Sequence, residues 1–476
     1  MSEPTRRTRR QFLATATMVG CATFSRTSAR PPAAAKPLDN NLQVVDLTDL
    51  DGKLPLVIER SHQVLRQTED WEHSTWKNPA WPKGGGDTVG YPSVVRNTHG
   101  PRPDGQYYLF YAHHDPRSGI GVAVSRSITG PYSKKVRVPG RSDNQVVPSF
   151  HASSKNPGDP SHNSSPWVVW NPEQRKWFMY FHFFNHGHTA TTNFQPTALA
   201  TCSDLASHRW TIRPGRVPGT VPAWLPVLPT TREAWANEAS SYNSVHRLPD
   251  GRWLGFIRGT SNDGRPTRLG FATSRNGVAF DYFKQNPILH ADDGGGGRKG
   301  VYRPGFIGFL GHSSGSPQYL VAWQESQPFD GDPRLIYGYT SDFKSITRDP
   351  RGHVRWEGSD GAISAWRDGN RLFLFSGKHV HELKLPVKTR SGFPPCIRSC
   401  KIESHDEPAH PVQTPIPGGR GRRHNRKPRI PGPRVPDPFS QRKTQHRHGW
   451  RRQGWRRRRA EPAPDGSREH RGDVRH

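Results

Sequence analysis

Five copies of a three-strand pattern recur along the middle of the chain, and this repeat constrains the fold more than any other feature. Each copy holds three β-branched or aromatic runs, separated by Gly, Asp or Pro turns. The period is roughly 60–77 residues, and the copies begin near residues 91, 165, 242, 303 and 362. One such blade cannot bury both of its faces alone, so blades pack radially. The sequence therefore predicts an all-β, five-bladed β-propeller over residues 85–385.

Residues 37–84 are expected to form a lead-in to the propeller. Within it, residues 54–60 read Leu-Pro-Leu-Val-Ile-Glu-Arg, which is typical of a short strand. The fifth copy is shorter than the others, so we expect this strand to complete the last blade and close the ring. Glycine and proline number 47 and 46 in the chain, which favours turns and short strands over helices.

The N-terminus is typical of an export signal. Arginines precede a short apolar, small-residue run over residues 12–24, which is too short to span a membrane. Residues 8–13, Thr-Arg-Arg-Gln-Phe-Leu, resemble a twin-arginine motif. We therefore expect residues 1–36 to direct export to the periplasm or the extracellular space. Cys21 ends a loose lipobox and is a candidate lipid anchor.

Much of the chain's positive charge lies near its two ends. The formal net charge is +29, of which residues 1–36 carry +6 and residues 386–476 carry +15. The middle is only mildly basic, so the composition does not predict a specific nucleic-acid partner. Residues 386–476 are rich in Arg, Pro, Gly and His and are expected to be disordered. A basic arm for polyanions and a frameshift product are the alternatives for this tail.

The first copy of the repeat resembles the five-bladed propeller glycosidases of glycoside hydrolase family 43 and their inulinase/invertase-type relatives. The resemblance rests on residues 107–111, Tyr-Tyr-Leu-Phe-Tyr, and on residues 129–132, Thr-Gly-Pro-Tyr. It extends over about residues 85–385. It implies a funnel lined by the innermost strand of each blade, with an aspartate base, a second aspartate and a glutamate acid on the first three blades.

The chain departs from this family pattern at all three acidic positions. The expected positions hold Tyr91, Ser165 and Ser241. Acids stand a few residues upstream of them instead, and we take these as the candidate catalytic residues: Asp87 as base, Asp159 as the orienting group and Glu238 as general acid.

Histidine, arginine and aromatic side chains form a second set of candidates. His113 and His162 are expected near the mouths of adjacent blades, and Arg303 opens blade four with a planar fork suited to a sugar carboxylate or sulfate. With Tyr91, these residues are the candidate substrate-binding set. Trp167, Trp235, Trp253 and Trp323 are expected in the core between blades. No metal site or cofactor is predicted, although a divalent cation in the funnel stays open.

The sequence thus predicts an exported, monomeric, carbohydrate-active protein that hydrolyses glycosidic bonds of a polysaccharide or oligosaccharide. Two alternatives stay open on the same scaffold. One is a propeller that binds polysaccharide without cleaving it, because the expected acidic positions are Tyr and Ser. The other is a His-dependent polysaccharide lyase.

Overall fold

A computed structural model describes most of the middle of the chain. The described residues are 37–50, 56–73, 89–113, 118–148, 162–184, 195–215, 224, 226–228, 235–237, 239–260, 267–290, 301–325, 334–355 and 362–386. The predicted export signal at 1–36 and the tail from 387 onward lie outside these ranges. Within them, no helix has the length and apolar character needed to cross a membrane.

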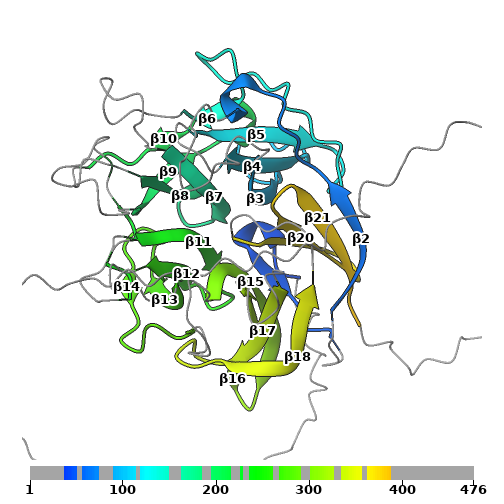
Figure 1. Cartoon of the computed structure of the whole chain (residues 1–476), viewed down its shortest axis with the longest axis vertical. Helices are drawn as coiled ribbons and strands as arrows, with labels where there is room; N and C mark the ends of the chain where they lie inside the picture. The colour runs from blue at the N-terminus through cyan, green and yellow to red at the C-terminus, as the bar shows by residue number, and fades with distance from the viewer. Residues whose placement is uncertain are drawn as a thin grey trace, which may run out of the picture. The chain divides into compact units, whose positions relative to one another are not determined.

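Five separate sheets are arranged around a common centre, as expected for a five-bladed propeller (Figure 1). Among the strands after residue 88, the first strand of each blade lies innermost, and the others follow outward in antiparallel order. Blade one holds β3 (Val89–Arg96), β4 (Tyr107–His113), β5 (Ile120–Ser125) and β6 (Gln145–Val147). Blade two holds β7 (His162–Asn171), β8 (Lys176–Phe184), β9 (Thr197–Cys202) and β10 (Thr211–Ile212).

The remaining three blades repeat this arrangement. Blade three holds β11 (Ala239–Arg247), β12 (Trp253–Thr260), β13 (Arg268–Ser274) and β14 (Asp281–Tyr282). Blade four holds β15 (Val301–Ser313), β16 (Ser316–Glu325), β17 (Arg334–Thr340) and β18 (Thr347–Arg355). Blade five holds β19 (Ser364–Asp368), β20 (Arg371–Ser376) and β21 (His379–Lys384). The five-bladed prediction is confirmed.

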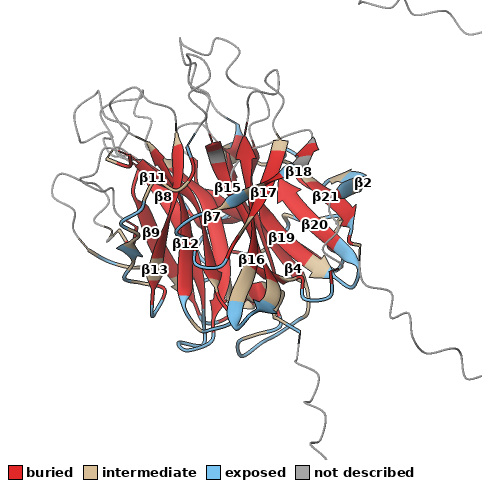
Figure 2. Ribbon diagram, turned by 90° about the horizontal axis from the view of Figure 1, so that it is seen from below, coloured by how far each residue is buried: buried red, intermediate tan, exposed pale blue. Residues whose placement is uncertain are grey.

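The core lies between the blades. Successive residues of a strand point to opposite faces of the sheet, so each blade presents apolar side chains to both neighbours. Five large clusters of buried side chains result, each drawn from two successive blades. The four tryptophans predicted for this core, Trp167, Trp235, Trp253 and Trp323, are all buried. Figure 2 shows the same result: the strands are buried along most of their length, and exposed residues gather at the turns.

The ring is closed by a strand from the N-terminal lead-in. β2 (Val57–Gln63) pairs antiparallel with β21 and becomes the outermost strand of blade five. This is the pairing expected for the strand at residues 54–60, although the observed strand begins and ends three residues later.

A second N-terminal segment fills the central channel, and the sequence analysis did not foresee it. The short helix η1 (Asn40–Leu42) leads into β1 (Val44–Asp46), which pairs parallel with β15 of blade four. Between them, the buried Gln43 donates from Nε2 to Val94 O at 3.0 Å and to Val168 O at 2.8 Å. Its backbone oxygen contacts His246, and its Oε1 accepts from Ser364 at 3.5 Å. This central segment, residues 39–47, therefore touches the innermost strand of every blade.

Candidate functional site

The innermost strands of blades one, two and three each carry a β-bulge near the mouth of the channel. The strand registers shift between Gly90 and Ser93, between Ser164 and Trp167, and between Ser241 and Ser244. Inside each bulge one residue adopts a left-handed backbone: Tyr91 (φ 58°), Ser165 (φ 53°) and Tyr242 (φ 55°). Such a conformation costs about 1–2 kcal/mol for a residue other than glycine. Its recurrence at one level of three blades marks a candidate functional site.

The bulges correct one of the predicted positions. Tyr91 and Ser165 do occupy equivalent places, but their counterpart in blade three is Tyr242, so the assignment of Ser241 is wrong by one residue. Ser241 stays in the ladder opposite Arg258, because the extra residue of the bulge comes after it. Blade four repeats the bulge between Pro304 and Ile307, with Gly305 inside it.

Side chains around Tyr242 form the centre of the site. The Tyr242 ring lies 5.6 Å from the Tyr91 ring and 4.9 Å from the His182 ring, measured between centroids. Two guanidinium carbons lie over the same ring, that of Arg258 at 4.4 Å and that of Arg303 at 5.9 Å. All five side chains are buried. We call them, together with His162, the Tyr242 cluster.

The two histidines of the cluster are directly linked. His162 Nε2 lies 3.1 Å from His182 Nε2, and the rings meet edge to face. A hydrogen bond between two imidazoles holds one proton between them, so this link is broken when both rings are protonated. His162 was predicted to bind substrate. His182 was passed over for that role, although its place on β8 opposite Ser164 brings it to the same level of the channel.

Arg258 is held by groups from the neighbouring strand. Its Nη1 donates to Ser241 Oγ at 3.2 Å, and its backbone N–H donates to Asn243 Oδ1 at 3.2 Å. Asn243 in turn donates from Nδ2 to Thr197 Oγ1 at 2.8 Å. The bond to Ser241 holds the guanidinium over Tyr242, and the bonds of Asn243 hold the Arg258 backbone, which lowers the ordering entropy that ligand binding would cost.

His113 is the last residue of β4 in blade one, and its backbone oxygen accepts from Ser164 Oγ of blade two at 3.5 Å. It is buried, and its ring centroid lies 5.9 Å from that of Trp71, which stacks on Tyr111 at 5.7 Å. Trp71 belongs to η2 (Asp70–Glu72), an element that the sequence analysis did not predict. His113 and His162 were expected near the mouths of adjacent blades, and the role of His113 in binding substrate stays a prediction.

A buried carboxylate anchors η2 beside blade one. Glu72 accepts a 2.6 Å hydrogen bond from the Tyr111 hydroxyl and is paired with Lys134, whose Nζ lies 2.7 Å from Glu72 Oε2. Burial, reinforced by the Glu72 charge, raises the pKa of Tyr111 well above its ordinary value. Because every oxygen of this carboxylate is bonded, Glu72 fixes structure and is not a candidate catalytic acid.

The predicted catalytic acids Asp87, Asp159 and Glu238 lie outside the described residues. In the sequence they come just ahead of β3, β7 and β11, the strands that carry the three bulges. The described part of the chain adds one carboxylate that the sequence analysis missed, Glu325 at the mouth end of β16. It accepts from Trp323 Nε1 at 2.7 Å and pairs with Arg348 at 2.9 Å.

The described residues bring together no group of three or more His, Cys, Asp or Glu side chains that fits a metal ion. The Tyr242 cluster instead combines aromatic faces, imidazoles and two fixed positive charges. Side chains of these types can bind anions and flat apolar rings, and their hydroxyl and imidazole groups can transfer protons.

No family model and no curated protein matches the sequence. Among solved structures, the chain is similar to a family 117 glycoside hydrolase from Zobellia galactanivorans, with 11% identity, a TM-score of 0.43, and coverage of 70% of this chain and 91% of that one. It is also similar to an arabinanase from Bacillus subtilis (12% identity, TM-score 0.39, coverage 66% and 96%). A third is an N-acetylgalactosamine deacetylase from F. plautii (12% identity, TM-score 0.44, coverage 67% and 85%). At these values the assignment of the fold rests on the strand topology itself.

Proposed function

We propose that this protein is a carbohydrate-active enzyme that hydrolyses glycosidic bonds of an acidic polysaccharide or oligosaccharide in the propeller funnel. The observation that carries the proposal is the pair of buried guanidinium groups, those of Arg258 and Arg303, that lie over the Tyr242 ring. Guanidinium forks bind carboxylate and sulfate groups bidentately. The Tyr91 and Tyr242 rings beside them offer the flat apolar surfaces on which sugar rings stack.

The hydrolytic step needs two carboxyl groups that flank the scissile bond. We assign Glu238 as the general acid that protonates the leaving oxygen and Asp87 as the base that activates water. Asp159 orients these groups and tunes their proton affinity. The support for this assignment is the sequence order, in which each acid directly precedes the innermost strand of one of three consecutive blades.

A second reaction on the same site is β-elimination, which a specific observation favours. The bulge positions hold Tyr91, Ser165 and Tyr242, whereas the family pattern places carboxylates on these blades. In an elimination the arginines would neutralise the uronate carboxylate, and a tyrosine or histidine would remove the C5 proton. The C5–H electron pair then forms the C4=C5 double bond as the C4–O bond breaks, and the leaving oxygen takes a proton from a second tyrosine or histidine to become a free hydroxyl.

The deciding experiment incubates the protein with a panel of uronate-containing and sulfated polysaccharides and their neutral counterparts. Hydrolysis releases reducing ends without ultraviolet absorbance, whereas elimination releases both. For hydrolysis, Glu238→Gln and Asp87→Asn are expected to slow the reaction by about 10²–10⁴-fold, while Glu59→Gln, an exposed acid on β2, leaves the rate unchanged.

The outcomes separate the candidates. Full activity of Glu238→Gln removes Glu238 from the mechanism. If the wild-type protein releases an unsaturated product and Tyr242→Phe loses activity, elimination replaces hydrolysis as the proposed reaction. Binding of acidic polysaccharide without any cleavage replaces both by a binding function.

We also propose that the protein is exported through the twin-arginine motif at residues 8–13. The support is the sequence alone: paired arginines ahead of a short apolar run. Replacing Arg9 and Arg10 by lysine is expected to retain a reporter fusion in the cytoplasm. Equal export of the two forms would reject the motif, and metabolic labelling with a fatty acid would test Cys21 as the lipid anchor.

A further inference from the structure

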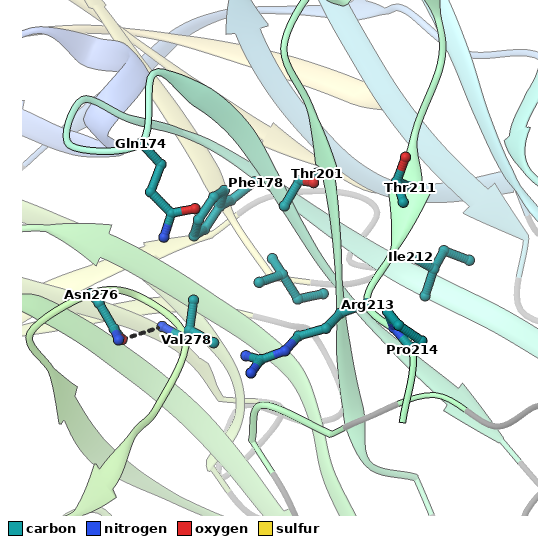
Figure 3. A pocket seen from close by; sticks show the side chains of 10 residues that line it. Gln174, Phe178, Thr201, Thr211, Ile212, Arg213, Pro214, Asn276 and Val278 are labelled. Carbon is teal, nitrogen blue, oxygen red and sulfur yellow. Dashed lines mark hydrogen bonds between the residues drawn. The ribbon is translucent and has the colours of Figure 1, made fainter. Parts of the chain in front are cut away.

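A cleft between blades two and three lies at the end of the ring opposite the Tyr242 cluster. The innermost strands run from the mouth toward the base, so the β7–β8 turn and the end of β13 lie at the base. The cleft has a volume of about 450 Å³, and its walls include Gln174, Phe178, Leu199, Arg213, Asn276 and Val278 (Figure 3). This volume falls within the range of small-ligand pockets, about 300–1,000 Å³.

One side of the cleft is apolar and its rim is polar. Phe178 and Leu199 form buried parts of the wall, and Val278 lies half-buried on the facing turn of blade three. Gln174 and Asn276 lie at the exposed rim. Asn276 Oδ1 accepts a hydrogen bond from the backbone N–H of Val278 at 2.9 Å (Figure 3). This bond stabilises the turn and does not use the side-chain amide nitrogen of Asn276. An apolar wall under a rim of amide donors suits a sugar ring.

Arg213 supplies the charge of the cleft. Its side chain extends from the β10 side across the cleft toward the turn that carries Val278 (Figure 3). No Asp or Glu stands among the described residues that line the cleft, and the described residues provide no ion pair for the Arg213 guanidinium. The nearest acid in sequence on the β7–β8 turn, Glu173, is paired with Arg247. Among the described lining residues, the half-buried positive charge of Arg213 therefore has no counter-charge.

We infer that this cleft is a second carbohydrate-binding site, specific for a sugar residue that bears a carboxylate. The anionic group would pair with Arg213, the ring would lie against Val278 and the neighbouring apolar wall, and Gln174 and Asn276 would bond its hydroxyls. The choice of a sugar as the ligand rests on the proposed function. The choice of an anion rests on the cleft alone.

The test measures binding of D-glucuronate and, as the uncharged partner, D-glucose by isothermal titration calorimetry at low salt. The wild-type protein is expected to bind glucuronate in the cleft and glucose about ten- to hundredfold more weakly there, since hydrogen bonds to charged groups contribute about 1.5–3 kcal/mol. Arg213→Gln is expected to abolish this component. Val278→Asp, which leaves Arg213 in place but adds a negative charge, should do the same.

The control is Arg209→Gln, an exposed arginine that lies just before β10, four residues from Arg213, and does not line the cleft. Equal losses in Arg209→Gln and Arg213→Gln would show a general charge effect and overturn the proposal, as would unchanged binding in Arg213→Gln. Arg303→Gln separates this site from the funnel: it should remove funnel binding and leave the component that depends on Arg213. If no polysaccharide is cleaved but that component persists, the proposed function fails and the cleft site stands.

Discussion

The base and the mouth of the propeller channel are the two ends of the same five innermost strands, but their side chains differ. At the base, the central segment fills the channel, and Gln43 bonds backbone oxygens of blades one and two. At the mouth, three bulges hold Tyr91, Ser165 and Tyr242 in a left-handed backbone, and two guanidinium groups are buried around one tyrosine ring.

The difference separates stability from function along one axis. The base pairs its polar groups and buries apolar side chains, which lowers the free energy of the folded state. The mouth keeps strained backbone and buries two guanidinium groups, and both the strain and the loss of hydration raise it. Such features persist where a ligand uses them, so substitutions at the two levels should change stability in opposite directions.

The largest expected effect is at the base. Leu47 is 2% exposed and packs in the cluster between blades four and five, against Gly308 of β15. Leu47→Ala should lower the free energy of unfolding by about 2–5 kcal/mol, because it leaves a cavity. Denaturant titration checks this, with Val57→Ala as the control because Val57 is 58% exposed. Equal losses in the two variants would contradict the role of the central segment.

A pH-dependent loss in the free energy of unfolding, of similar or smaller size, is expected from His246, which contacts Gln43. Burial lowers its pKa from 6.5 to about 4, so the folded protein keeps the ring neutral. Between pH 6.5 and 4 the unfolded chain takes up a proton that the folded chain does not, so stability falls as the pH falls. The loss is about 3 kcal/mol and is complete below pH 4. His246→Gln should flatten this part of the stability–pH curve, and an unchanged slope would reject the assignment.

At the mouth, one substitution should stabilise the protein. Ser165 adopts a left-handed backbone, and its hydroxyl is buried with no hydrogen-bond partner among the described residues. Ser165→Gly should therefore raise the free energy of unfolding by about 1 kcal/mol. Ser164→Gly is the matched control, because the neighbouring Ser164 has no positive φ, and it should destabilise. Destabilisation by both variants would show that the bulge is not strained.

The smallest expected effect is that of removing the C-terminal tail, for which we expect no change in stability. Deletion of residues 390–476 should leave the melting temperature unchanged within error, because the composition of this tail cannot build a core. A melting temperature several degrees lower would show that the tail belongs to the fold.

The sequence predicted the propeller because its signal is local and repeated. Residues 107–111 alternate between two apolar faces, and the same alternation returns in every blade. The closing strand could be found in the same way. The central segment could not, because residues 40–46 have no periodicity and their partners, such as Val168, lie more than a hundred positions away.

The site was predicted less completely. The predicted substrate-binding residues Tyr91 and Arg303 lie against Tyr242, and His162 lies against His182, while their role in binding stays a prediction. Tyr242 itself was missed, because a β-bulge adds a residue that the sequence pattern does not reveal. Arg258 was missed because it comes from a second strand, and its approach to Tyr242 depends on the pairing of β11 with β12.

The two N-terminal strands have a consequence for the order in which the molecule is built. β1 pairs with β15, and β2 pairs with β21, so each waits for a partner synthesised far later. The ring cannot be completed until Lys384, the last residue of β21, has left the ribosome. A chain that stops before this point has an unpaired strand at its start and an open seam beside blade one. The N-terminal strands can therefore pair only after the later blades have been synthesised, and only a chain translated through blade five can close the ring.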